Sequence, residues 1–225
     1  MKTFLKISGI AYVFIFISGF YANFIILETL IDSNKSSETI GNMINNPDQF
    51  KNGLIVFLIM IISDILLVWS LFKVTKPIHK TLSHIASIFR GFHAVFFIVA
   101  LFQLSKIYNL TCNATYSIQL ETKVFDLLLW FDKLWTIGLL FFAAHLLVLS
   151  YLILKSSYIP RFIGYFLIAA AIGYFIDCFS KLYFANYNDY KFYFETMVVF
   201  TAVIGELSFT LWLIFKGFSK KTFRL

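Results

Sequence analysis

Long apolar stretches alternate with shorter polar ones along the whole chain. The apolar stretches cover about residues 4–31, 51–74, 80–107, 124–155, 161–184 and 195–218. Each is longer than a buried helix of a soluble protein requires, and each provides the roughly 20 residues that cross the hydrocarbon core of a bilayer. The pattern predicts an all-α, polytopic integral membrane bundle: six transmembrane helices in a single domain that covers residues 1–225.

The polar connections alternate between loops (32–48, 108–123 and 186–191) and short turns (76–80 and 156–161), which predicts three helical hairpins. The second helix of each hairpin reads alike, with a polar residue, then an aromatic residue, then a lysine: Asp64, Trp69 and Lys73; His145, Tyr151 and Lys155; Glu206, Trp212 and Lys216. One hypothesis is three hairpin repeats around a common polar centre. The alternative is chance, because an aromatic residue and a terminal lysine commonly anchor membrane helices.

Composition supports the membrane assignment. The chain is 60% hydrophobic and only 14% charged, whereas a soluble domain carries about 25% charged residues. The lipid bilayer is therefore the expected partner, and no length remains for a separate soluble domain. Cys112 and Cys178 form no disulfide framework; they indicate two unpaired thiols or one bond on the outer side.

Charge fixes the expected orientation. The side that holds the N-terminus carries eleven cations and no acid, and the opposite side carries six cations against eight acids. Because Lys and Arg accumulate on the cytoplasmic side, we expect a multi-pass protein of the inner (plasma) membrane with both termini in the cytoplasm. The net charge of +7 is spread over separate loops and termini, so nucleic acid is not an expected partner.

Several ionisable residues interrupt the apolar segments, where a charge costs roughly 2.5–3.5 kcal/mol at the helix centre. They are Asp64, Arg90, His93, Asp132, Lys133, His145, Asp177 and Glu206. Asp64 lies nine residues from Lys73; Arg90, His145 and Glu206 each lie ten residues from the cation that ends their helix. At 1.5 Å per residue all four lie about 15 Å deep, near the midplane. Four helices thus carry a polar group at one level.

We expect Asp64, Arg90, His145, Asp177 and Glu206 to bind a ligand. His93 follows Arg90 by three residues and shares its helix face. A metal site built from His93, His145 and Glu206, with Asp64, is chemically reasonable for zinc or iron, although separate helices make spacing uninformative. The sequence has no glycine-rich phosphate loop and no His-Glu-x-x-His motif, so the cofactor stays unknown.

A family resemblance agrees with these residues. Its marks are Asp64, Phe89-Arg90, Ala144-His145-Leu146, Ser150-Tyr151-Leu152, Tyr158-Ile159-Pro160-Arg161-x-x-Gly164, Gly173-Tyr174-x-x-Asp177 and Gly205-Glu206-Leu207. Together they resemble a family of bacterial membrane proteins described as domain of unknown function 4386, from about Lys6 to Gly217. His93 departs from the amide residue of that family, which weakens the metal interpretation. The resemblance implies a bacterial inner-membrane protein and transfers no activity.

Three functions remain open at this stage. The first, which we favour, is binding or transport of a small polar or amphipathic ligand, with Arg90 on an anionic group and the carboxylates carrying protons. The second is an intramembrane enzyme that acts on a lipid, with His145 as general base and Glu206 or Asp64 orienting it or holding a metal. The third is a structural or regulatory subunit in which these residues only fix helix packing.

Overall fold

The computed structural model describes residues 1–31 and 35–219 and contains helices but no strand in these ranges. The first span runs through α1 (Lys2–Phe20), a π-helical segment η1 (Tyr21–Leu27) and α2 (Glu28–Leu30). The short α3 (Ser36–Asn45) follows, and then α4 (Pro47–Thr75), α5 (Lys80–Thr111), α6 (Ile118–Lys155), α7 (Arg161–Tyr183) and α8 (Tyr187–Phe218). Within residues 1–31 and 35–219, six helical spans are long and apolar enough to cross a membrane. The predicted all-α bundle of six membrane helices is therefore confirmed.

Helix ends differ from the predicted ones where the chain is polar. The predicted loop 32–48 contains α3, whose Thr39, Ile40 and Met43 are buried at helical spacing. The predicted loop 108–123 is mostly helical, and α8 begins at Tyr187 rather than near 195. Hydropathy marks the part of a helix that meets lipid, whereas the helix itself continues into polar surroundings.

The chain divides into two compact units. The first unit comprises Met1–Val13, Asp64–Ala94 and the chain from Thr136 onward; the second comprises Phe14–Ser63 and Val95–Trp135. Helices α1, α4, α5 and α6 contribute to both. Every ionisable residue expected to bind a ligand belongs to the first unit.

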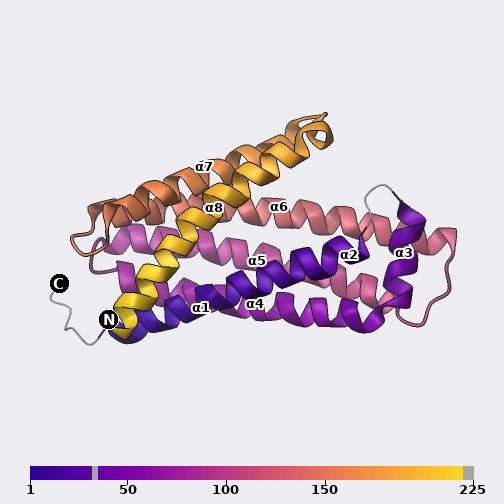
Figure 1. Ribbon diagram of the computed structural model, residues 1–225, viewed down its shortest axis with the longest axis horizontal. Helices are drawn as coiled ribbons and strands as arrows, with labels where there is room; N and C mark the ends of the chain where they lie inside the picture. The colour runs from indigo at the N-terminus through magenta and orange to yellow at the C-terminus, as the bar shows by residue number, and fades with distance from the viewer. Residues whose placement is uncertain (32–34, 220–225) are drawn as a thin grey trace. The chain divides into compact units, whose positions relative to one another are not determined.

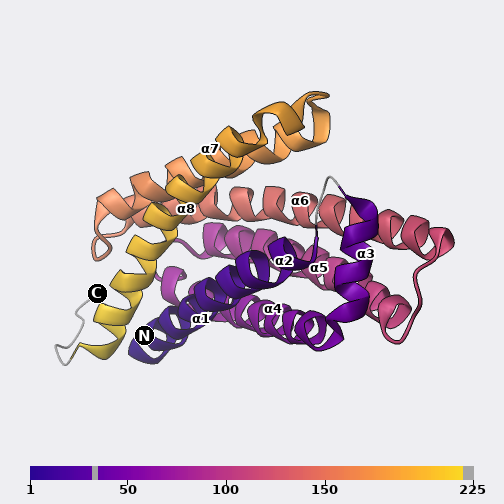
Figure 2. The same ribbon diagram turned by 45° about the vertical axis from the view of Figure 1, so that its right-hand side comes forward.

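In the first unit, α7 and α8 form an antiparallel pair that lies side by side in both views (Figure 1, Figure 2). The C-terminal end of α8 packs closely on α1, because a Cβ on Gly217 would lie 2.9 Å from the backbone nitrogen of Lys6. The turn after α6 is tied to α4 by the Tyr158 hydroxyl, which donates to the Val74 carbonyl at 2.9 Å. Burial raises the pKa of Tyr158 to about 12, so this hydroxyl remains a donor at neutral pH.

The second unit is held by aromatic packing. The Trp135 ring stacks on Phe97 with centroids 3.8 Å apart and meets the edge of Phe57 at 5.5 Å. A hollow of about 400 Å³ lies between α1 and α4, lined by Phe14, Ile17, Ser18, Tyr21, Asn52, Ile55, Val56 and Ile59. Its lining contains no ionisable acid or base except the phenol of Tyr21. No disulfide joins Cys112 and Cys178 in the described part of the chain.

Outward faces of the helices are apolar in both units. On α4 the exposed side chains include Ile62, Ile65 and Trp69 at three- and four-residue spacing, while Asp64 on the same helix is buried. A water-soluble protein has the reverse arrangement. These apolar faces therefore contact the lipid bilayer, and the polar side chains lie in the interior of the protein.

Candidate functional site

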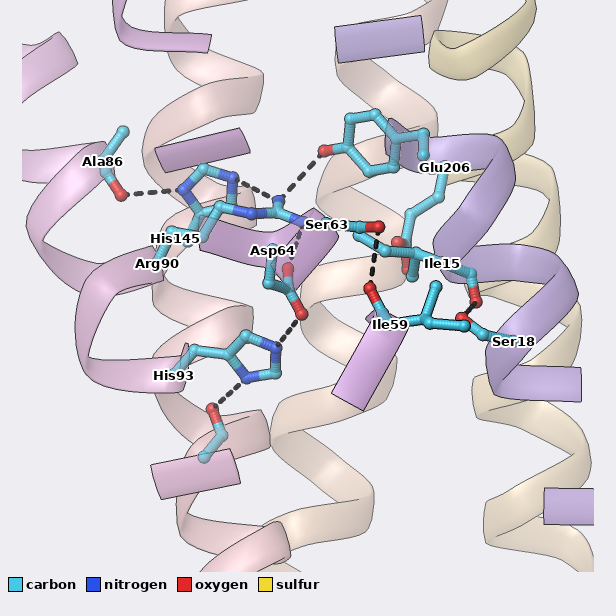
Figure 3. Close-up of polar contacts among 12 residues, drawn as sticks. Ile15, Ser18, Ile59, Ser63, Asp64, Ala86, Arg90, His93, His145 and Glu206 are labelled. Atoms are coloured by element: carbon cyan, nitrogen blue, oxygen red, sulfur yellow. Dashed lines mark hydrogen bonds and ion pairs between the residues drawn. The ribbon is translucent and has the colours of Figure 1, made fainter. Parts of the chain in front are cut away.

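Arg90 is the centre of a buried polar cluster in the first unit. Its Nη2 donates to Asp64 Oδ1 at 2.6 Å, and its Nη1 donates to the Tyr12 hydroxyl at 3.1 Å and to His145 Nε2 at 3.2 Å. Figure 3 shows the contacts of Arg90 with Asp64 and His145; the four side chains come from α1, α4, α5 and α6. Arg90 and His145 are each 1% exposed and Asp64 is 2% exposed, so the guanidinium is shielded from solvent.

His145 has a defined tautomer in this arrangement. An arginine has no acceptor, so His145 Nε2 must accept the Arg90 N–H. Its Nδ1 then carries the hydrogen and donates to the Ala86 carbonyl at 2.8 Å. His145 is therefore a neutral imidazole, and its Nε2 lone pair accepts the Arg90 N–H. To act as a general base it would first have to release the guanidinium.

His93 lies on the other side of Asp64. Its Nδ1 is 3.0 Å from the Gly138 carbonyl and its Nε2 is 3.4 Å from Asp64 Oδ2. Asp64 thus receives Arg90 on one carboxylate oxygen and faces His93 with the other, as Figure 3 shows. The Phe142 ring packs against both cation-forming groups, 4.9 Å from the His93 ring and 5.3 Å from Arg90 Cζ.

Glu206 is buried in the same unit but has a different environment. Its Oε1 accepts a hydrogen bond from the Tyr174 hydroxyl at 3.1 Å. It interacts electrostatically with Arg90 and Asp64, yet it forms no ion pair in the described part of the chain. The two carboxyl groups near Arg90 therefore have different partners. Asp64 forms an ion pair with Arg90, whereas Glu206 accepts from the hydroxyl of Tyr174.

Close packing of α7 on α8 brings Tyr174 to Glu206. A Cβ on Gly205 would lie 2.8 Å from the Phe166 carbonyl oxygen, and a Cβ on Gly173 would lie 2.5 Å from Thr201 Oγ1. Glycines on facing helices let two backbones approach closely in a membrane. Both glycines stand next to a residue of the hydrogen-bonded pair, so the same small residues that join the helices also position the pair.

Asp177 lies apart from the Arg90 contacts. Its Oδ1 accepts a hydrogen bond from the Tyr187 hydroxyl at 2.7 Å, and Asp177 is 9% exposed. The structure thus joins Asp64, Arg90 and His145 directly, places Glu206 within electrostatic range of them, and gives Asp177 a separate partner near the start of α8.

The metal candidates do not converge in the described ranges. Among residues 1–31 and 35–219, no three His, Cys, Asp or Glu side chains are arranged to hold a metal ion. His93 faces Asp64, whereas His145 faces Arg90 and Glu206 binds Tyr174. The candidate metal ligands thus contact different partners.

Sequence reasoning missed the tyrosines. Tyr12 and Tyr174 each bind an ionisable member of the cluster, although a tyrosine in an apolar segment is usually assigned to the membrane interface. The available signal was depth, because Tyr12 lies six residues after Lys6 and Tyr174 lies thirteen after Arg161, too deep for an interfacial ring.

Comparison with known proteins agrees with the sequence motifs. A protein of Archaeoglobus fulgidus, described as an uncharacterized protein, is 32% identical over 164 residues, which cover 72% of this chain and 81% of the relative. No solved structure matches the chain. The family described as domain of unknown function (DUF4386) matches residues 7–217, a range that contains the whole Arg90 cluster. The chain therefore belongs to this family of membrane-spanning helical proteins.

Proposed function

We propose that the protein binds a small polar or amphipathic ligand at the Arg90 cluster and transports it, with Asp64 and Glu206 exchanging protons. The observation that carries this proposal is Arg90 Nε, a buried N–H donor without an acceptor among the described residues. Such a donor costs about 1–3 kcal/mol, and buried polar groups without partners are rare. A ligand carboxylate, phosphate or carbonyl oxygen would satisfy it.

Two further features support binding rather than helix packing alone. An Arg90–Asp64 pair would suffice to join α4 and α5, yet Tyr12, His93 and His145 also converge on it. Ionisable groups inside a membrane commonly mark substrate and proton pathways. The orientation that we propose, with both termini in the cytoplasm of a cell and the protein in its inner membrane, rests on the distribution of cations.

Native mass spectrometry of the protein in nanodiscs tests binding. Arg90→Lys keeps a cation beside Asp64 but removes the Nε–H donor, so it isolates the proposed contact from the ion pair. We expect the wild type to retain a small non-protein mass that Arg90→Lys loses. Ile65→Ala, on the exposed face of α4 beside Asp64, serves as the control and should retain it.

Transport is tested with the compound so identified. In proteoliposomes that contain a pH-sensitive dye, its uptake should acidify or alkalise the lumen in the wild type. Glu206→Gln keeps an oxygen that accepts from Tyr174 but cannot carry a proton, so it should bind the compound without moving protons. A wild-type protein that carries no small molecule would refute the binding proposal and leave a packing role for the cluster.

A further inference from the structure

His93 makes two polar contacts that one neutral imidazole cannot satisfy together. Its Nδ1 is 3.0 Å from the Gly138 carbonyl oxygen, which can only accept, so Nδ1 carries a hydrogen. Its Nε2 is 3.4 Å from Asp64 Oδ2. In the neutral Nδ1–H tautomer, the bare Nε2 would direct its lone pair at a carboxylate oxygen. In the other tautomer, the bare Nδ1 would face the carbonyl oxygen instead.

Both contacts are favourable only when a second proton is present, either on His93 Nε2 or on Asp64 Oδ2. The side chains of His93 and Asp64 are 4% and 3% exposed, so solvent does not relieve a repulsive contact there. We infer that His93 Nε2 and Asp64 Oδ2 together form a proton-binding site that holds one proton in the folded protein. This inference does not depend on the ligand proposed above.

The proton resides on His93 rather than on Asp64. Arg90 donates to the other oxygen of Asp64 at 2.6 Å, and charge-assisted bonds to an ionised carboxylate are shorter than neutral ones. The Phe142 ring, which packs on both His93 and Arg90, favours cations at its surface. The pair is thus an imidazolium beside a carboxylate.

The other ionisable groups around this pair come from five helices. Arg90 of α5, His145 of α6, Tyr12 of α1, Tyr174 of α7 and Glu206 of α8 all interact electrostatically with Asp64.

Nitrogen-15 NMR of histidine-labelled protein in nanodiscs tests the site directly. The chain has four histidines, and His79→Gln with His84→Gln removes the two outside the cluster. At neutral pH we expect His93 to show two protonated nitrogens, while His145 shows one protonated and one bare nitrogen as an internal reference. In Asp64→Asn, whose amide can donate to Nε2, His93 should show one bare nitrogen.

The wild-type spectrum decides the matter even if Asp64→Asn fails to fold. Infrared difference spectroscopy reports whether Asp64 carries a carboxylic proton. A neutral His93 beside a protonated Asp64 would still support the shared proton. A neutral His93 beside an ionised Asp64 would overturn the inference, whatever mass spectrometry finds about a ligand.

Discussion

Arg90 is among the largest fully buried side chains of the protein, and its environment explains how a membrane interior tolerates it. Removing a charge from water costs several kilocalories per mole even after relaxation, and an ion pair repays this only when the remaining donors are bound. Asp64 supplies the opposite charge, while Tyr12 and His145 supply neutral acceptors. The Arg90 Nε–H has no acceptor among the described residues, so it is the donor that a ligand oxygen would satisfy.

At this scale we predict that Arg90→Leu destabilises the protein by about 3–5 kcal/mol, because it leaves the Asp64 carboxylate buried with no guanidinium. The double variant Arg90→Leu with Asp64→Leu leaves neither charge alone, so it should lose far less than the sum of the single variants. Tryptophan-fluorescence unfolding in detergent measures both effects. Additive losses would show that the two side chains act independently, contrary to the 2.6 Å contact between them.

Among the helices, the close approach of α7 and α8 is sensitive to one added methyl group. Gly205→Ala would place a Cβ 2.8 Å from the Phe166 carbonyl oxygen and 3.2 Å from the Ala170 Cβ. A backbone oxygen cannot rotate away, so we expect a loss of about 1–3 kcal/mol from overpacking. The shift between the helices should also lengthen the Tyr174–Glu206 contact.

Gly91→Ala on α5 is the matched control, since its Cβ would meet nothing within 4 Å. Alanine favours a helix over glycine by about 0.5–1 kcal/mol, so this variant should be neutral or slightly stabilising. Thermal unfolding of both variants side by side provides the measurement. Equal stability of Gly205→Ala and the wild type would mean that the two helices separate without cost.

Depth along a helix explains how much of the site was predictable. A constant rise of 1.5 Å per residue lets a count from a terminal lysine place Asp64, Arg90 and His145 at one level, and the structure brings these three together. The count gives height but no direction around the helix. It therefore could not reveal that His93 would face Asp64 or that Glu206 would bind Tyr174 instead of Arg90.

Helix extents were less predictable for a different reason. Hydropathy reports where lipid surrounds a helix, so the polar α3 and the first two turns of α8 gave no signal. Burial of Ile40 and Met43 stabilises α3, and stacking of Tyr187 on Phe194 at 5.6 Å supports the start of α8. These contacts are tertiary, and periodicity in one segment cannot report them. The three-hairpin repeat stays a prediction.

For the molecule as a whole, one pattern of charges predicts its orientation in the membrane. Every spanning helix has a lysine or arginine at the end nearest the N-terminal side: Lys2, Lys73, Lys80, Lys155, Arg161 and Lys216. Antiparallel succession puts these six ends on one side of the bilayer. Cations retained on the cytoplasmic face would account for all of them, and the loop that holds Cys112 would then lie outside.

Cys112 permits a test of this orientation without adding a residue. It is half-buried and follows directly on α5, whereas Cys178 is fully buried. We predict that a membrane-impermeant maleimide labels the protein in intact cells, that Cys112→Ser abolishes the label, and that Cys178→Ser retains it. Labelling of Cys112 that required permeabilisation would reverse the orientation, so the ends that carry the lysines would face outward against the usual distribution of charge.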